Sequence, residues 1–220
     1  LLYHPAVAWL KQELKRGNLG RLLYLYSQRV NLGVVRQDEN VVSSLATHDI
    51  SVCLHLLGEF PSKVICAGQS YLQKKIEDVA FAVLFFPSGA VAHFHMSWLD
   101  PHKIRKITLV GSKKMAVFDD MAAEEKVRVF DKSVVGSRWL TGGADIPAAT
   151  PLSIRYGDIF APKLDDQEPL KIELTDFVRC CLTRSTPLAD GRNAVAVLAV
   201  MDGLQKSLKR NGKAVSLPNP

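Results

Sequence analysis

A histidine followed by an aspartate, His48-Asp49, is the pair whose chemistry stands out in this chain. It lies in the segment NVVSSLATHDISVCLHLLG, which ends at Gly58. Apolar residues recur there at the spacing of a helix with one buried face, at Ile50, Leu54 and Leu57. We expect His48 near the start of this helix, with Thr47 as its cap and Asp49 favoured by the helix dipole. The dipole would keep His48 neutral and able to act as a general base. A histidine satisfied by a local hydrogen bond is the competing interpretation.

Other candidate ligands and nucleophiles are sparse. His93 and His95 lie two residues apart on an expected strand, hence on one face, but no third residue is spaced to complete a metal site. We therefore expect no metal there, and a polar or interface-facing surface. Cys53 and Cys66 lie in apolar runs and are expected in the core, and no CxxC pair occurs. This cysteine usage favours a reducing, cytoplasmic location.

The composition is that of a globular protein. Of the 220 residues, 47% are hydrophobic, which suffices for one domain with a sizeable core. No apolar run approaches the roughly 18 residues of a membrane span, and the first residues, LLYHPAV, do not read as a signal peptide. The net charge of +6 is scattered in short basic groups. We therefore expect neither nucleic acid nor membrane as a partner, and a basic balance suits an anionic small ligand.

Helices and strands that could position these residues can be read from the hydrophobic pattern. Helices are expected from Pro5 to Gly17, around His48, and over 171–183 and 191–211, the last with Val195, Leu198, Met201 and Leu208 on its buried face. Strands are expected over 21–30, 63–68, 79–86, 90–98, 104–110, 114–118 and 126–130. Residues 133–168 read as an irregular segment. The pattern predicts one α+β domain over 1–220, an open, mostly antiparallel sheet with helices packed on one face.

Nucleotide-binding motifs are missing from the sequence. Neither GxGxxG nor GxxxxGK[ST] occurs, and the glycines are dispersed. We therefore expect this chain by itself to bind no dinucleotide.

Four segments, in order, resemble the C-terminal, substrate-binding domain of the Gfo/Idh/MocA oxidoreductases, the glucose-fructose oxidoreductase-like family. They are His48 ten residues before Gly58, then FPSGAVAHFHMSW, WLDPHKIRKITLVGSKKMAVFDD and DGRNAVAVLAVMDGLQKSLKRNG. The segments RYGDIFAPKLDDQEPL and NLGVVRQDEN are similar to the branch of UDP-N-acetylglucosamine 3-dehydrogenases and UDP-N-acetyl-glucosaminuronate dehydrogenases. The resemblance covers nearly the whole chain.

The resemblance implies half of an enzyme that oxidises a hydroxyl of a sugar or nucleotide-sugar. An N-terminal Rossmann domain, which this chain lacks, would hold NAD or NADP and supply a catalytic lysine, so the isolated chain should be inactive. His48 would take the hydroxyl proton, and the substrate-binding candidates are Asn31, Arg36, Asn40 and Asp49. A homodimer or homotetramer through the open sheet is implied as well.

Two departures from the family pattern keep an alternative open. Many members carry aspartates four residues before the histidine and three after it, where this chain has Ser44 and Ser51. Neither serine can polarise an imidazole as a carboxylate does, so the partner of His48 is not identified. The alternative is a non-catalytic module that keeps the fold for dimerisation or ligand sensing.

Overall fold

Four helices and nine strands follow one another in the computed structural model, which describes residues 1–135 and 152–218. The helices are α1 (Pro5–Lys15), α2 (Val41–Leu57), α3 (Pro169–Thr183) and α4 (Gly191–Lys209). The strands are β1 (Leu22–Val30), β2 (Lys63–Gln69), β3 (Val79–Phe85), β4 (Val91–Ser97), β5 (Ile104–Gly111), β6 (Met115–Asp119), β7 (Val127–Val135), β8 (Ser153–Phe160) and β9 (Val215–Ser216).

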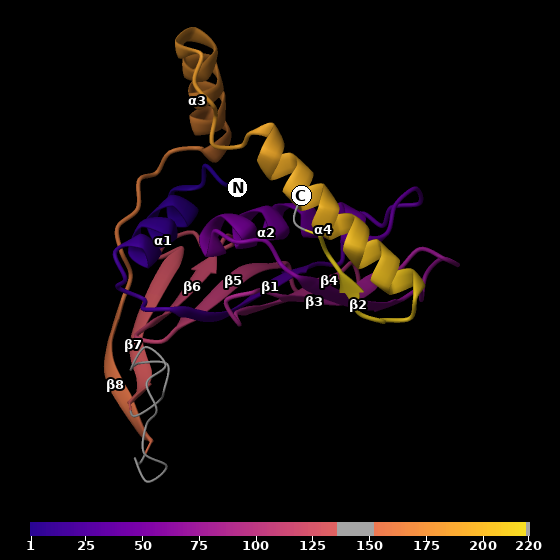
Figure 1. Cartoon of the computed structure of the whole chain (residues 1–220), viewed down its shortest axis with the longest axis horizontal. Coiled ribbons are helices and arrows are strands. Elements are labelled where there is room, and N and C mark those ends of the chain that lie inside the picture. Colours follow the sequence, from indigo (N-terminus) through magenta and orange to yellow (C-terminus); the bar gives the residue numbers. More distant parts are fainter. Residues whose placement is uncertain (136–151, 219–220) are drawn as a thin grey trace.

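The strands form a single sheet in the order β8-β7-β6-β5-β1-β4-β3-β2-β9. All pairings are antiparallel except that between β1 and β4. The first strand of the chain, β1, lies between β5 and β4 in the middle of the sheet. In Figure 1, α1, α2 and α4 lie on one side of the sheet, and α3 projects away from it. Among the described residues, no helix covers the other face. The predicted α+β fold, with a mostly antiparallel open sheet and helices on one face, is confirmed.

The core lies between the sheet and these three helices. Its largest fully buried side chains include Trp98, Phe94 and Phe118. Cys53 and Cys66 are fully buried, as expected from the apolar runs that hold them. Burial raises the pKa of the Cys66 thiol to about 12, so this cysteine is an inert packing residue.

Part of the segment predicted to be irregular is in fact strand. Residues 133–135 complete β7 and 153–160 form β8, while 136–151 lie outside the described residues. The local pattern concealed β8, because Gly157 and Asp158 are poor strand formers and few of its side chains are buried. Its pairing with β7 is what holds it extended.

The apolar face of α4 differs from the predicted one at its start. Val195 and Leu198 are 56% and 66% exposed, whereas Met201 and Leu208 are buried as expected. Between them Val197 is 4% exposed and belongs to the core, so the buried face of α4 begins at Val197 and not at Val195 and Leu198.

Candidate functional site

His48 lies in the middle of α2, not at its start. The N-cap is Asn40, whose Oδ1 accepts a hydrogen bond of 3.1 Å from the Ser43 backbone N–H. The prediction that Thr47 caps the helix was therefore wrong, and so was the dipole argument, because the free N–H groups of α2 lie two turns before His48. The His48 pKa is still lowered, first by partial removal from water and then by the positive charge of Arg29.

Asn40 is occupied within the protein. Its Nδ2 donates to Glu77 Oε2 at 2.9 Å and to Gln205 Oε1 at 3.0 Å. Gln205 Nε2 donates back to Asn40 Oδ1 at 2.9 Å. The amide therefore caps α2 and joins it to α4, and it has no group left for a substrate. This arrangement argues against the expectation that Asn40 binds the sugar.

Asp49 is likewise committed to a protein partner. Its Oδ2 accepts from Arg29 Nε at 2.9 Å and its Oδ1 from Arg29 Nη2 at 2.7 Å, a bidentate ion pair between α2 and β1. Asp49 is 2% exposed and Arg29 is 8% exposed. The expected substrate contact of Asp49 is therefore not supported, and this carboxylate instead anchors the arginine beside His48.

Asp120 connects the surroundings of Arg29 to a histidine at the start of α1. His4 Nε2 lies 3.8 Å from Asp120 Oδ1, and Arg105 Nη1 lies 3.7 Å from Asp120 Oδ2. Asp120 also raises the pKa of Arg29, so the two lie within electrostatic range of each other. His4 Nδ1 accepts from the Ala6 N–H at 3.0 Å as the cap of α1, and burial lowers its pKa. Arg29 thus acts electrostatically on His48 and on Asp120, and Asp120 in turn forms the ion pair with His4.

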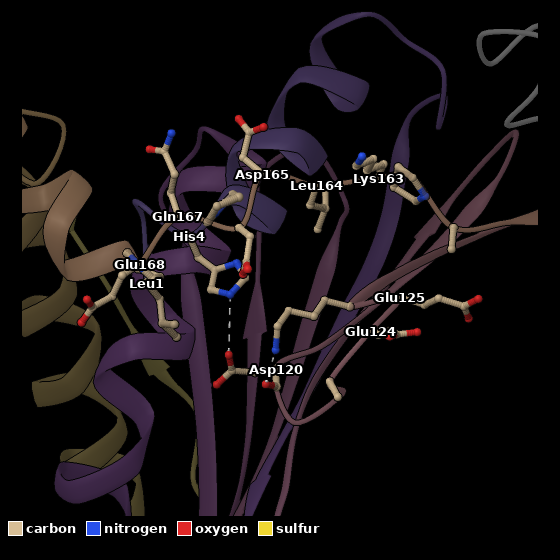
Figure 2. Close-up of a pocket in the computed structure, with 17 residues that line it drawn as sticks. Leu1, His4, Asp120, Glu124, Glu125, Lys163, Leu164, Asp165, Gln167 and Glu168 are labelled. Atoms are coloured by element: carbon tan, nitrogen blue, oxygen red, sulfur yellow. Dashed lines mark hydrogen bonds and ion pairs between the residues drawn. The ribbon is translucent and has the colours of Figure 1, made fainter.

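An open cavity of about 930 Å³ adjoins this region at His4 and Asp120. Figure 2 shows His4 in the cavity wall with its imidazole directed at Asp120, and the chain from Lys163 to Glu168 passing over it. Six carboxylates line the cavity against two lysines: Asp120, Glu124, Glu125, Asp165, Asp166 and Glu168. His48 does not line it. The cavity is acidic, so it is a poor match for an anion and leaves sugar hydroxyls or a cationic group as the better fit.

The other predicted substrate residues lie on the loop between β1 and α2. Asn31 follows β1 directly, and its backbone N–H donates to Ser97 O at 3.1 Å. Arg36 is exposed, with its Nε 3.8 Å from Glu39 Oε1. In the part of the chain that the structure describes, no hydrogen bond or ion pair joins either side chain to His48. Asn31 is half-buried and Arg36 is exposed, so solvent reaches both, and nothing in their surroundings identifies a ligand.

The remaining candidates have structural partners. Ser51 Oγ donates to Asn193 Oδ1 of α4 at 3.1 Å, so it does not serve His48. His95 stacks on Phe81 with ring centroids 4.6 Å apart on the uncovered face of the sheet, with His93 beside it. The described residues contain no group of three metal-ligating side chains. They also contain no helix long and apolar enough to cross a bilayer.

Arg29 and Asp120 were not singled out by sequence reasoning. Arg29 had a detectable signal, because it follows Leu25 and Ser27 at every second position of β1 and so lies on the inward face of the strand. A charged residue on a buried face needs a partner. No signal in the sequence pointed to Asp120, because Asp119-Asp120 lies in a turn between strands, where aspartates are common.

Solved structures of sugar oxidoreductases share this fold. UDP-N-acetylglucosamine 3-dehydrogenase GnnA from Acidithiobacillus ferrooxidans matches with a TM-score of 0.71 and 20% identity, over 96% of this chain and 60% of its own. Aldose-aldose oxidoreductase from Caulobacter crescentus matches with a TM-score of 0.73 and 16% identity, over 98% and 62%. A levoglucosan dehydrogenase in complex with NADH and levoglucosan gives 0.75 and 15%, over 100% and 64%. The chain spans less than two thirds of the length of these structures. No curated protein sequence matches it.

The family model of the GFO/IDH/MocA C-terminal domain matches residues 7–117, which is 111 of the 220 residues. The matched segment runs from α1 to β6 and includes His48, Arg29 and Asp49. The match covers just over half of the chain, and the fold of the remainder agrees with it. The chain therefore belongs to the GFO/IDH/MocA C-terminal domain family.

Proposed function

We propose that this domain is the substrate-binding half of an NAD(P)-dependent oxidoreductase that oxidises a hydroxyl of a sugar or nucleotide-sugar. The observation that carries the proposal is His48, an exposed histidine whose pKa is lowered by partial burial and by Arg29. Membership of the family and the sugar-oxidising enzymes among the similar structures support the same activity. The likeness to GnnA supports a nucleotide-sugar.

In the proposed reaction His48 accepts the proton of the substrate hydroxyl. A neutral imidazole has a nitrogen lone pair available for that proton, and a lowered pKa keeps the imidazole neutral at physiological pH. Oxidation of an alcohol to a ketone also requires a hydride acceptor, which a nicotinamide cofactor supplies when it is bound. Asn31 and Arg36 are proposed to contact the sugar or its diphosphate, since arginine binds phosphate through two parallel hydrogen bonds.

The cofactor site is proposed to lie in a separate Rossmann domain. A dinucleotide site needs a glycine-rich turn between a parallel strand and a helix. In the described residues, β1 is followed by a polar loop of ten residues, and its parallel neighbour β4 leads into β5. The described residues therefore do not fit a nicotinamide dinucleotide by themselves, and we assign none of them to it. The four cysteines are free thiols, which supports the proposed cytoplasmic location.

The test uses the full-length protein that contains this domain. NAD or NADP is offered with UDP-N-acetylglucosamine, UDP-N-acetylglucosaminuronate or levoglucosan, and reduction of the nicotinamide is followed by absorbance. We expect turnover with a UDP-sugar and a loss of at least a hundredfold in kcat in His48→Gln. His55→Gln, on the same helix, is the matched control and should retain activity. No turnover with any pair, or full activity of His48→Gln, would favour the non-catalytic module.

The open face of the sheet is proposed to pair with a second copy of the chain. Tyr24 and Phe81 are 44% and 46% exposed on this face, and Tyr24 stacks on the half-buried Tyr26. Exposed aromatic patches of this kind are typical of protein interfaces. Phe81→Lys should reduce the mass measured by light scattering to that of a monomer, and an unchanged mass would exclude this face.

A further inference from the structure

The Arg29–Asp49 pair is unusual for its depth. Arg29 is on a central strand and Asp49 on the covering helix, and both are more than nine-tenths buried. A buried ion pair of this kind is costly to desolvate and contributes little net stability, so a role in stability does not explain its presence. A role at His48 would explain it, because Asp49 directly follows His48 in the chain.

Arg29 retains one nitrogen that the pair does not use. Nε and Nη2 are bound to Asp49, while Nη1 makes no hydrogen bond to any described residue. The side-chain atoms that are fully buried without a partner, among the described residues, are Ser27 Oγ and Asp78 Oδ1. Nη1 is not one of them and is therefore reached by water. The guanidinium is thus fixed by Asp49 through two nitrogens, and the third keeps only a small contact with solvent.

We propose that Arg29, clamped by Asp49, is the positioning residue of His48. It fixes α2 over β1 at the residue next to His48 and holds a permanent positive charge close to the imidazole. The inference rests on the proposed role of His48 as a base, and it identifies Arg29 as the group that holds the imidazole neutral. Asp49 has the complementary task of holding the charge in place without approaching the substrate.

The charges around His48 agree with this role. Beside Arg29 from β1, the side-chain charges that act on it are those of Arg105 from β5 and of Asp49 from its own helix. The two arginines oppose protonation of His48, and Asp49 favours it. Arg29 is the strongest of these charges and is the one that cannot move, because its guanidinium is buried and doubly bonded.

His4 provides an internal control. Its pKa is lowered by burial and raised by Asp120, and Arg29 is not among the groups that act on it. Removing the Arg29 charge should therefore change the titration of His48 and leave that of His4 unchanged. A general loosening of the fold would change both.

The experiment is a pH titration of the histidine ring protons by nuclear magnetic resonance, with His48 assigned by His48→Gln. Arg29→Leu alone would leave the Asp49 carboxylate buried without a partner, so the informative variant is Arg29→Leu combined with Asp49→Asn. We expect the proton affinity of His48 to rise roughly threefold in the double variant, the net effect of two opposite charges at different distances. In Arg29→Lys, which keeps the charge, it should stay within about twofold of wild type.

A fall in the proton affinity of His48, no change, or an equal change at His4 would overturn the inference. The readout needs no turnover, so it is independent of the proposed function. If the enzyme is active, the acidic limb of its pH–kcat/KM profile should move to higher pH in the double variant. A shift in the titration with no activity of the wild-type enzyme would leave the inference standing and refute the proposed function.

Discussion

Replacing Asn40 by alanine should destabilise the domain, because this side chain caps α2 and ties it to α4. The amide Oδ1 accepts from Ser43 N–H, and the two amide groups of Asn40 and Gln205 bond to each other in both directions. A third contact, from Nδ2 to Glu77, closes the network. None of these bonds survives in alanine. The same substitution would have no effect on stability if Asn40 were only a substrate ligand.

The expected loss follows from the bonds removed. An N-cap replaced by alanine costs about 1 kcal/mol, and each partly exposed amide hydrogen bond contributes about 0.5–1 kcal/mol. With three further bonds removed, the free energy of unfolding of Asn40→Ala should fall by about 2.5–4 kcal/mol. Asn40→Ser keeps a cap oxygen but loses the three amide bonds, so its loss should be smaller, about 1.5–3 kcal/mol.

Urea unfolding followed by far-ultraviolet circular dichroism measures these differences. Asn31→Ala is the matched control, because Asn31 lies on the same loop and its side chain makes no hydrogen bond to a described residue, only its backbone N–H being bonded. It should change the free energy by less than about 0.5 kcal/mol. Equal stability of Asn40→Ala and Asn31→Ala would refute the reasoning, as would an Asn40→Ser variant less stable than Asn40→Ala.

Two further predictions concern acid stability and the attachment of α3. Five histidines have their pKa lowered in the folded state, chiefly by burial: His4, His48, His55, His93 and His95. The unfolded chain therefore binds more protons, and stability should fall as pH drops below about 6.5. Thermal unfolding between pH 8 and pH 5 in steps of about one unit checks this, and a Tm that is constant or rises toward acid would contradict it. Tyr3→Phe removes the 2.7 Å hydrogen bond from the Tyr3 hydroxyl to Asp176, so amide exchange in α3 should accelerate severalfold. Unchanged exchange in α3 would show that this contact does not hold the helix.

Much of the architecture was predictable from local pattern. Seven strands and three helices were expected within five residues of their observed bounds, because alternation and helical spacing of apolar residues reflect which side of each element is buried. The exception is α2, which begins at Val41, six residues before the predicted cap Thr47. The turn Pro87-Ser88-Gly89 joins β3 to β4, and these two strands pair antiparallel, as strands joined by a short turn do. The insertion of β1 between β5 and β4 was not predictable, since it depends on contacts between residues far apart in the chain.

In the candidate site, too, local pattern predicted the residue but not its distant partners. His48 is identifiable from its residue type and its helix, but its surroundings are not. Asn40 was predicted to contact the substrate, and the structure places it as the cap of α2, bonded to Glu77 and Gln205, which are distant in sequence. Asp49 was predicted to contact the substrate as well, and the structure places it in a bidentate pair with Arg29.

The sequence by itself determined the class of fold, the family, and the histidine around which a reaction can be built. Only the tertiary structure decided which charges surround that histidine, because Arg29, Asp49 and Arg105 come from three separate elements and act through space. The lowered pKa of His48 was expected from the dipole of its own helix and arises instead from partial burial and from Arg29 on a neighbouring strand. Periodicity records which face of an element is buried, whereas the partner of a buried charge is fixed only when the elements pack.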